Sequence, residues 1–171
     1  CIKGLKVFRK KEDYQAYLDK LVEIAADYKT EILAYCLTPN TVHLVLQPKT
    51  EEALGKVVRQ VHSFYSRYYN EKYKANGSIW GERFASCPVE KAQLDRVCRH
   101  VERAFVTPNT KRKVESYEYN SAAEHISKKS SEIVSDKFPA AKDKKKWAKF
   151  INTTPDPEEV EEIDYCTRRG Y

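Results

Sequence analysis

The spacing of apolar residues predicts alternating helices and strands in the first two thirds of the chain. Apolar side chains recur every three or four residues, as on a buried helix face, in three stretches: 12–28, 51–73 and 91–106. Runs or alternations of apolar residues that are typical of strands occupy three others: 31–37, 42–47 and 84–89. Asn76-Gly77 is a strong turn signal and ends the second helix.

The order helix, strand, strand, helix, strand, helix predicts an α+β fold. We expect a ferredoxin-like antiparallel sheet with its helices on one face. A strand upstream of residue 1 would complete that pattern. The sequence contains no Met, even at position 1, so we expect the numbered chain to begin inside a longer protein.

The pattern weakens after about residue 114, and three parts are predicted. Residues 1–126 form the α+β domain, which is incomplete at its N-terminus. Residues 127–146 are rich in Lys and Ser and are typical of a basic linker. Residues 147–171 form a small C-terminal helical extension, with an acidic helix starting near Pro157.

Charge is concentrated in the middle of the chain. Residues 56–113 hold thirteen Lys and Arg against five Asp and Glu, whereas residues 1–55 balance at eight of each. Tyrosines and Trp80 lie among these basic residues. Such a segment suits a phosphate backbone with unstacked bases nearby, and it equally suits a solvated helix face over an aromatic core.

Composition excludes several classes of protein. Five cysteines without a C-x-x-C pair argue against a disulfide scaffold and against a zinc ribbon. No apolar run approaches the ~20 residues of a membrane span, and no secretory leader opens the chain. We therefore expect a cytoplasmic protein that has no membrane partner.

Five short motifs follow one another along the chain. They are AYCLTPNTVHLVL at 34–46, YSRYYN at 65–70, GSIWGERF at 77–84, SAA at 121–123 and CTRRGY at 166–171. In order and at matching spacing, these motifs resemble the REP-associated tyrosine transposases of the insertion-sequence 200 group, whose pattern at the first motif is near YCLMPNHVHLLL. The resemblance implies a single-strand transposase of the HUH type. It also implies single-stranded or hairpin DNA as partner, with a monomer or a homodimer both open.

The resemblance further implies a site of two histidines, an Asn and a tyrosine nucleophile, with a divalent metal (Mg or Mn). This chain departs from the pattern at three of those four positions. Thr41 replaces the first histidine and only His43 remains; His100 stands at the tyrosine position, and Ala104 at the Asn position. Tyr117 and Ser121 keep their family spacing and so fix this register.

Without the metal ligands and the phenol, strand cleavage loses both its Lewis acid and its nucleophile. We therefore predict a transposase-like DNA-binding protein with no intact catalytic residue, in which His43 is a vestigial ligand and no cofactor is assigned. One alternative is a zinc site made by His43, His100 and Glu102. A second is an active transposase whose nucleophile has moved to Tyr65, Tyr68, Tyr69 or Tyr73.

Basic residues and one tryptophan are the candidate DNA contacts. They are Arg67, Lys72, Lys74, Trp80, Arg83, Arg96, Arg99 and Arg103. The last three recur at helical spacing and are either a phosphate track or a salt-bridged surface, of which we favour the track. Trp80 could stack on a base or cap the core. A remaining hypothesis is a domesticated domain that binds RNA or a protein.

Overall fold

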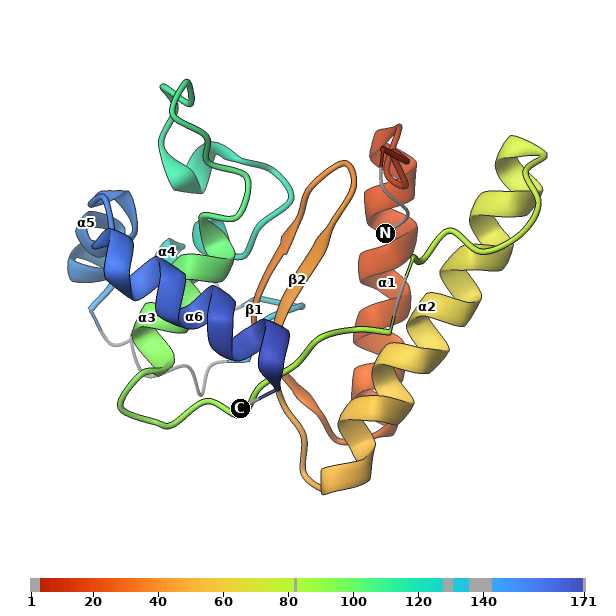
Figure 1. The fold of residues 1–171 in the computed structure, drawn as a ribbon, viewed down its shortest axis with the longest axis horizontal. Helices are drawn as coiled ribbons and strands as arrows, with labels where there is room; N and C mark the ends of the chain where they lie inside the picture. The colour runs from red at the N-terminus through yellow and green to blue at the C-terminus, as the bar shows by residue number, and fades with distance from the viewer. Residues whose placement is uncertain (1–3, 82, 128–130, 136–142, 171) are drawn as a thin grey trace.

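The computed structural model describes residues 4–81, 83–127, 131–135 and 143–170. The elements follow in chain order (Figure 1): α1 (Lys11–Asp27), β1 (Glu31–Leu37), β2 (Val42–Gln47), α2 (Glu51–Tyr73), α3 (Leu94–Glu102), a 3-10 turn η1 (Val114–Ser116), α4 (Ala122–Ile126), α5 (Lys144–Asn152) and α6 (Pro157–Arg169). The α+β class, the antiparallel pairing and the C-terminal helices are confirmed.

Strands β1 and β2 form an antiparallel hairpin in which Glu31 faces Gln47 and Leu37 faces Val42. The outer side of β1 is covered by later chain, because Leu37 N donates to Tyr119 O at 2.8 Å and Ser121 N donates to Tyr35 O at 3.0 Å. Within the described ranges β2 pairs only with β1, so its other edge carries no strand.

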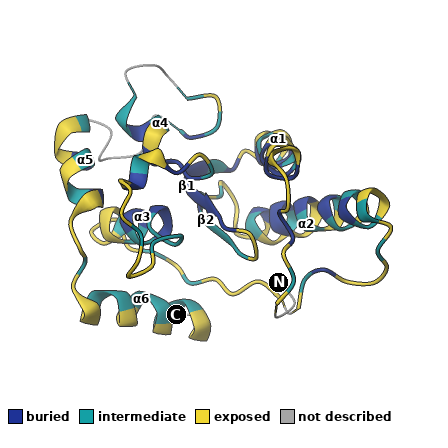
Figure 2. Ribbon diagram, turned by 90° about the horizontal axis from the view of Figure 1, so that it is seen from above, coloured by how far each residue is buried: buried dark blue, intermediate teal, exposed yellow. Residues whose placement is uncertain are grey.

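Helices α1 and α2 cover one face of the hairpin and enclose the first core (Figure 2). Their apolar stripes meet the strand residues that point to that face. Tyr17, Tyr65 and Leu21 are fully buried there. The periodicity of 12–28 and 51–73 predicted both helices correctly because tertiary packing uses the same stripe that the spacing defines.

The opposite face of the hairpin is also covered, which corrects the expectation that the helices lie on one face. Leu33, Ala34 and Cys36 of β1 belong to a second core with residues of α3 and α5. Strand β1 is buried at six of its seven positions, because its alternate side chains enter the two different cores. A continuously apolar strand such as EILAYCL is typical of a sheet that is covered on both faces.

The predicted strand at 84–89 is wrong, because these residues join no sheet in the part of the chain that the structure describes. A strand exists only where a neighbouring backbone completes its hydrogen bonds, and Pro88 removes one of the donors. The third helix is shorter than predicted: α3 covers Leu94–Glu102 and is flanked by turns.

The C-terminal segment packs on the second core. Helix α5 starts at Lys144, where the Asp143 side chain accepts from Lys146 N at 3.0 Å, and it buries Trp147 and Ile151. Within 127–146, Val134 is buried in the first core, and residues 128–130 and 136–142 lie outside the described residues. A search of the described helices found none that is long and apolar enough to span a membrane.

Candidate functional site

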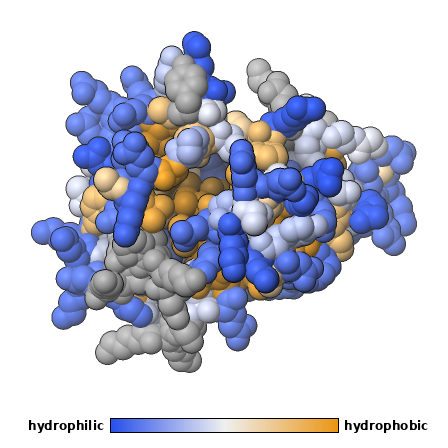
Figure 3. Space-filling model, turned by 90° about the horizontal axis from the view of Figure 1, so that it is seen from below, coloured by the Kyte–Doolittle hydropathy of each residue, from blue (hydrophilic) through white to orange (hydrophobic). Residues whose placement is uncertain are grey.

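A cavity of about 1190 Å³ lies between β2, α3, the segment after Phe84 and the C-terminal part of α6. Its lining is largely apolar, with Leu44 and Val97 among the side chains. Figure 3 views the molecule from below and shows apolar surface within a hollow on that face. His43 and His100 both line the cavity, so the fold brings together two of the positions that the resemblance assigns to one site.

His43 is presented by β2 and is partly buried. Its Nε2 atom lies 3.2 Å from the hydroxyl of Thr41, the residue that the resemblance places at the other histidine position. Burial lowers the pKa of His43, and the nearby His100 lowers it further. The imidazole is therefore held toward its neutral form.

His100 extends from α3 toward α6, where its Nε2 lies 3.3 Å from Asp164 Oδ1. Burial lowers the pKa of His100, although the Asp164 carboxylate opposes this change. Asp164 is half exposed and also lines the cavity. The partner of His100 is thus supplied by the C-terminal helix, sixty-four positions farther along the chain.

The residues at this site do not fit a divalent metal. A search of the described residues found no group of three or more His, Cys, Asp or Glu side chains that could hold a metal ion. His43 contacts Thr41, a neutral hydroxyl, and Ala104 has no ligand atom. Mg²⁺ requires about six oxygen ligands in octahedral geometry, and this set does not provide them.

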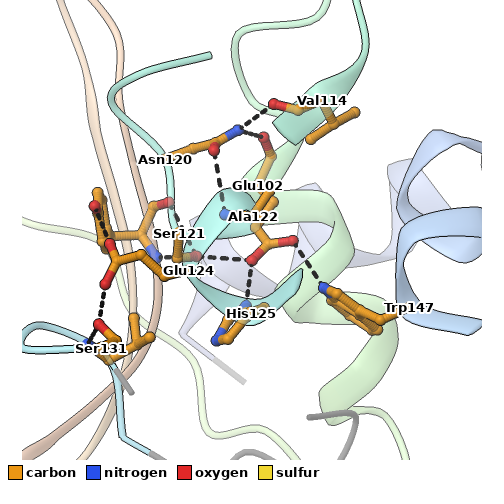
Figure 4. Close-up of polar contacts among 11 residues, drawn as sticks. Glu102, Val114, Asn120, Ser121, Ala122, Glu124, His125, Ser131 and Trp147 are labelled. Carbon is orange, nitrogen blue, oxygen red and sulfur yellow. Dashed lines mark hydrogen bonds and ion pairs between the residues drawn. The ribbon is translucent and has the colours of Figure 1, made fainter. Parts of the chain in front are cut away.

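Glu102 points away from the cavity, which rules out its role in the alternative zinc site. Its carboxylate is fully buried and accepts hydrogen bonds from three directions (Figure 4). Ser121 Oγ lies 2.8 Å from Oε1, His125 Nδ1 lies 2.5 Å from Oε1, and Trp147 Nε1 lies 3.2 Å from Oε2. The carboxylate therefore ties α3 to α4 and α5.

A second set of contacts holds the backbone beside Glu102. The Asn120 side-chain amide donates to Glu102 O and Val114 O, both at 3.0 Å (Figure 4). Sequence reasoning missed this network, although its register argument had already used Ser121. The one signal in the sequence is Glu102, a polar residue inside the apolar stripe of 91–106. That signal does not identify the distant residues that bind its carboxylate.

The three arginines of α3 have different environments. Arg96 is exposed, whereas Arg99 is only 5% exposed and its guanidinium lies 2.5 Å from Glu159 of α6. Arg103 is partly buried and donates to Ile151 O at 2.7 Å. The ion pair of Arg99 matches the salt-bridged alternative, Arg103 instead binds a backbone carbonyl, and of the three only Arg96 is exposed.

The remaining candidate DNA contacts also divide into two groups. Lys72 Nζ lies 2.7 Å from the buried Asp13 carboxylate. Trp80 donates from Nε1 to His62 O at 3.0 Å and stacks on the His62 ring, which matches the core-capping alternative. Side chains that are exposed are Arg67, Lys74 and Arg83.

The α2 tyrosines are held by acceptors in the N-terminal segment. Tyr65 is fully buried and donates to Val7 O at 2.8 Å, and Tyr69 donates to Lys6 O at 3.3 Å. Tyr73 donates to Asp13 at 2.6 Å; burial and that hydrogen bond raise the pKa of its phenol to about 12. Tyr68 also contacts Asp13, at 3.3 Å.

Comparison with known proteins gave one match. A family model described as "Transposase IS200 like" matches residues 3–104, which run from the N-terminal segment through α1, the hairpin and α2 to the end of α3. No match was found among the curated proteins, and none among the solved structures.

Proposed function

This chain belongs to the family of IS200-like transposases, and from that premise we propose that it binds structured single-stranded DNA, in particular hairpins, without cutting it. Family membership makes DNA the expected partner. The proposed restriction to hairpins comes from the resemblance to the REP-associated members. The proposed loss of cleavage comes from the residues of this chain.

The observation that carries the proposal is the environment of His100. This residue stands where the family places its tyrosine nucleophile, and its ring faces Asp164. An imidazole that attacked phosphorus would form a labile phosphohistidine instead of a stable phosphotyrosine link. With Thr41 and Ala104 at two ligand positions, the site also lacks the groups that would hold the scissile phosphate through a metal.

The contacts of three of the α2 tyrosines argue against a replacement nucleophile among them. A phenol attacks efficiently when a base removes its proton and the oxygen can reach the phosphate. Tyr65 and Tyr69 are buried and donate to backbone carbonyls. The raised pKa of Tyr73 makes its phenolate less accessible at neutral pH. These contacts support binding without strand transfer.

DNA binding would rest on the exposed cations of the central segment. Arg67, Lys74, Arg83 and Arg96 are exposed and could neutralise phosphates. Arg99, Arg103 and Lys72 already have partners within the chain and are left out of the proposed contact.

The test is fluorescence anisotropy with a labelled hairpin pool, a matched duplex and an unstructured strand, each over a salt series. We expect a hairpin preference of at least tenfold over the unstructured strand, equivalent to about 1.4 kcal/mol. The variant R83Q/R96Q should weaken binding to all probes. As a matched control, K29Q/K49Q removes two exposed charges outside residues 56–113 and should change little.

Cleavage is tested separately on the same labelled hairpins with Mg²⁺ or Mn²⁺. We expect full-length strands on a denaturing gel and no protein–DNA adduct. An adduct that maps to an α2 tyrosine would establish an active enzyme and overturn the proposed loss of cleavage. Equal, weak binding to all three DNA probes would overturn hairpin recognition.

A further inference from the structure

A second basic surface lies outside the set of residues that the sequence singled out. Three consecutive cations, Lys111, Arg112 and Lys113, are exposed in the loop between α3 and η1. The loop is ordered by its own contacts, since Thr110 N donates to Thr107 O and Thr107 N to the Thr110 hydroxyl, both at 2.9 Å. The cations are therefore presented on a shaped loop.

Arg112 rests on an aromatic platform. Its guanidinium carbon lies 5.0 Å from the ring centre of Phe105 and 4.8 Å from that of Tyr117, and the two rings stack at 4.2 Å. A cation over a ring face gains electrostatic stabilisation and loses freedom of movement. This packing fixes the direction in which the basic loop leaves the second core.

Helix α5 brings more cations beside this loop. Its last residue, Asn152, accepts from Val114 N at 3.0 Å and donates to Glu115 at 2.7 Å, which joins the helix to the residue following Lys113. Lys149 lies one turn before Asn152, and Lys145 one turn before Lys149. A row of exposed amines therefore continues from the loop along α5.

These lysines are not neutralised inside the chain. Among the described residues Lys111, Lys113, Lys145, Lys146 and Lys149 form no ion pair. The nearby carboxylates have other partners: Glu115 bonds Asn152, Glu118 pairs with Lys11, and Asp143 caps α5. Exposed cations on two adjoining elements, without an ion pair in the described chain, are suited to an external anionic partner.

We propose that the basic loop and α5 together contact the phosphate backbone of the paired stem of a DNA hairpin. This inference rests on the proposed function for the identity of the partner. Among the described residues, the large hydrophobic side chains that are exposed, Phe84 and Tyr165, lie elsewhere, and Arg112 covers the aromatic pair beside the loop. The surface therefore offers charge without a stacking platform, which favours backbone contact over recognition of unstacked bases.

The experiment compares K113Q/K149Q with the wild type and with the control K29Q/K49Q, using a fully paired DNA duplex and a DNA hairpin as probes. Both substituted lysines are exposed, and a thermal melt checks that each variant is folded. Each lost phosphate contact should reduce the slope of log K against log salt by about 1. We therefore expect a slope lower by about 2 on both probes, and the control should retain the wild-type slope.

A slope equal to that of the control would overturn the proposal. A reduced slope on an RNA hairpin but not on either DNA probe would also overturn it, because the surface would then serve RNA. A third outcome is that the wild type shows no hairpin preference, while K113Q/K149Q still lowers the salt slope measured with duplex DNA. That result would contradict hairpin recognition and would support contact of this surface with paired DNA. If the wild type binds no DNA, both proposals fall.

Discussion

The first half of the molecule runs from the N-terminal segment through α2, and the second half follows α2. Each half contains one fully buried carboxylate, and the two carboxylates are held by different kinds of contact. Asp13 of α1 accepts from the Arg9 and Lys10 amides at 2.8 and 2.9 Å and from Lys72 Nζ at 2.7 Å. Within the described chain, the carboxylate of Glu102 in α3 accepts from the side chains of Ser121, His125 and Trp147.

The comparison shows how a local motif and a long-range motif differ in what they stabilise. The two amide contacts of Asp13 lie at the start of the helix to which it belongs, so they would exist in any folded α1. Every side-chain partner of Glu102 comes from later elements. Loss of Glu102 should therefore affect the packing of several elements, whereas loss of Asp13 should weaken one helix start and its contact with α2.

The largest expected effect is that of Glu102→Ala. It removes the carboxylate that accepts from the Trp147 indole, the Ser121 hydroxyl and the His125 ring, and it creates a cavity in the second core. We therefore expect a loss of about 3–5 kcal/mol in the free energy of unfolding. Urea unfolding measures it. Asp95→Ala on the exposed side of α3 is the control and should cost about 0.5 kcal/mol or less. A loss under about 1 kcal/mol for Glu102→Ala would show that the network is dispensable.

A smaller and pH-dependent effect is expected for Asp13→Asn. Burial would raise the pKa of Asp13, but hydrogen bonds from Lys72, Tyr73 and the two amides outweigh it and lower the pKa to about 2. A shift from 3.8 to about 2 corresponds to about 2 kcal/mol of stability at neutral pH.

The sign of this pH dependence follows from the lowered pKa. The unfolded state binds a proton first as the pH falls, so the stabilisation is complete above about pH 4 and disappears toward about pH 2. Urea unfolding of the wild type and of Asp13→Asn is measured at pH 6 and at pH 3. The difference between their free energies of unfolding should be smaller at pH 3. A constant difference would mean that the charge of Asp13 is not what stabilises the helix start.

The smallest expected effect concerns the ion pair that links α3 to α6. Glu159→Gln weakens the 2.5 Å pair with the buried Arg99, but Arg99 keeps its position 4.1 Å from the Phe150 ring centre. We expect about 1 kcal/mol, expressed as faster amide exchange in α6 and little change in α1 or α2. Glu161→Gln, which is exposed on the same helix, is the control. Uniformly faster exchange throughout the protein would contradict a local role.

Sequence periodicity predicted the first half better than the second. The apolar stripes of 51–73 and the runs at 31–37 and 42–47 match α2, β1 and β2, because each element buries the face that its own spacing defines. Residues 84–89 have strand composition but no pairing partner in the described chain. Pairing depends on a neighbour, which the composition of one segment does not specify.

The candidate site, too, was predicted only in part from the sequence. The resemblance linked His43 and His100, and both line one cavity. It did not indicate that α6 brings Asp164 to His100 or Glu159 to Arg99, since these partners lie sixty or more positions away. Arginine spacing on α3 defined a helical stripe correctly but not the environment of each arginine, because the packing of α5 and α6 determines which of them reach solvent.

The separation of Glu102 from Trp147 has a consequence for synthesis. These residues are 45 positions apart, so α3 is made well before the indole that completes its network. At roughly 5–20 residues per second, the interval is about 2 to 9 seconds. Most of the first core can pack once α2 has left the ribosome, with Val134 added later. The buried face of α3, by contrast, stays open to water or to a chaperone until α5 arrives.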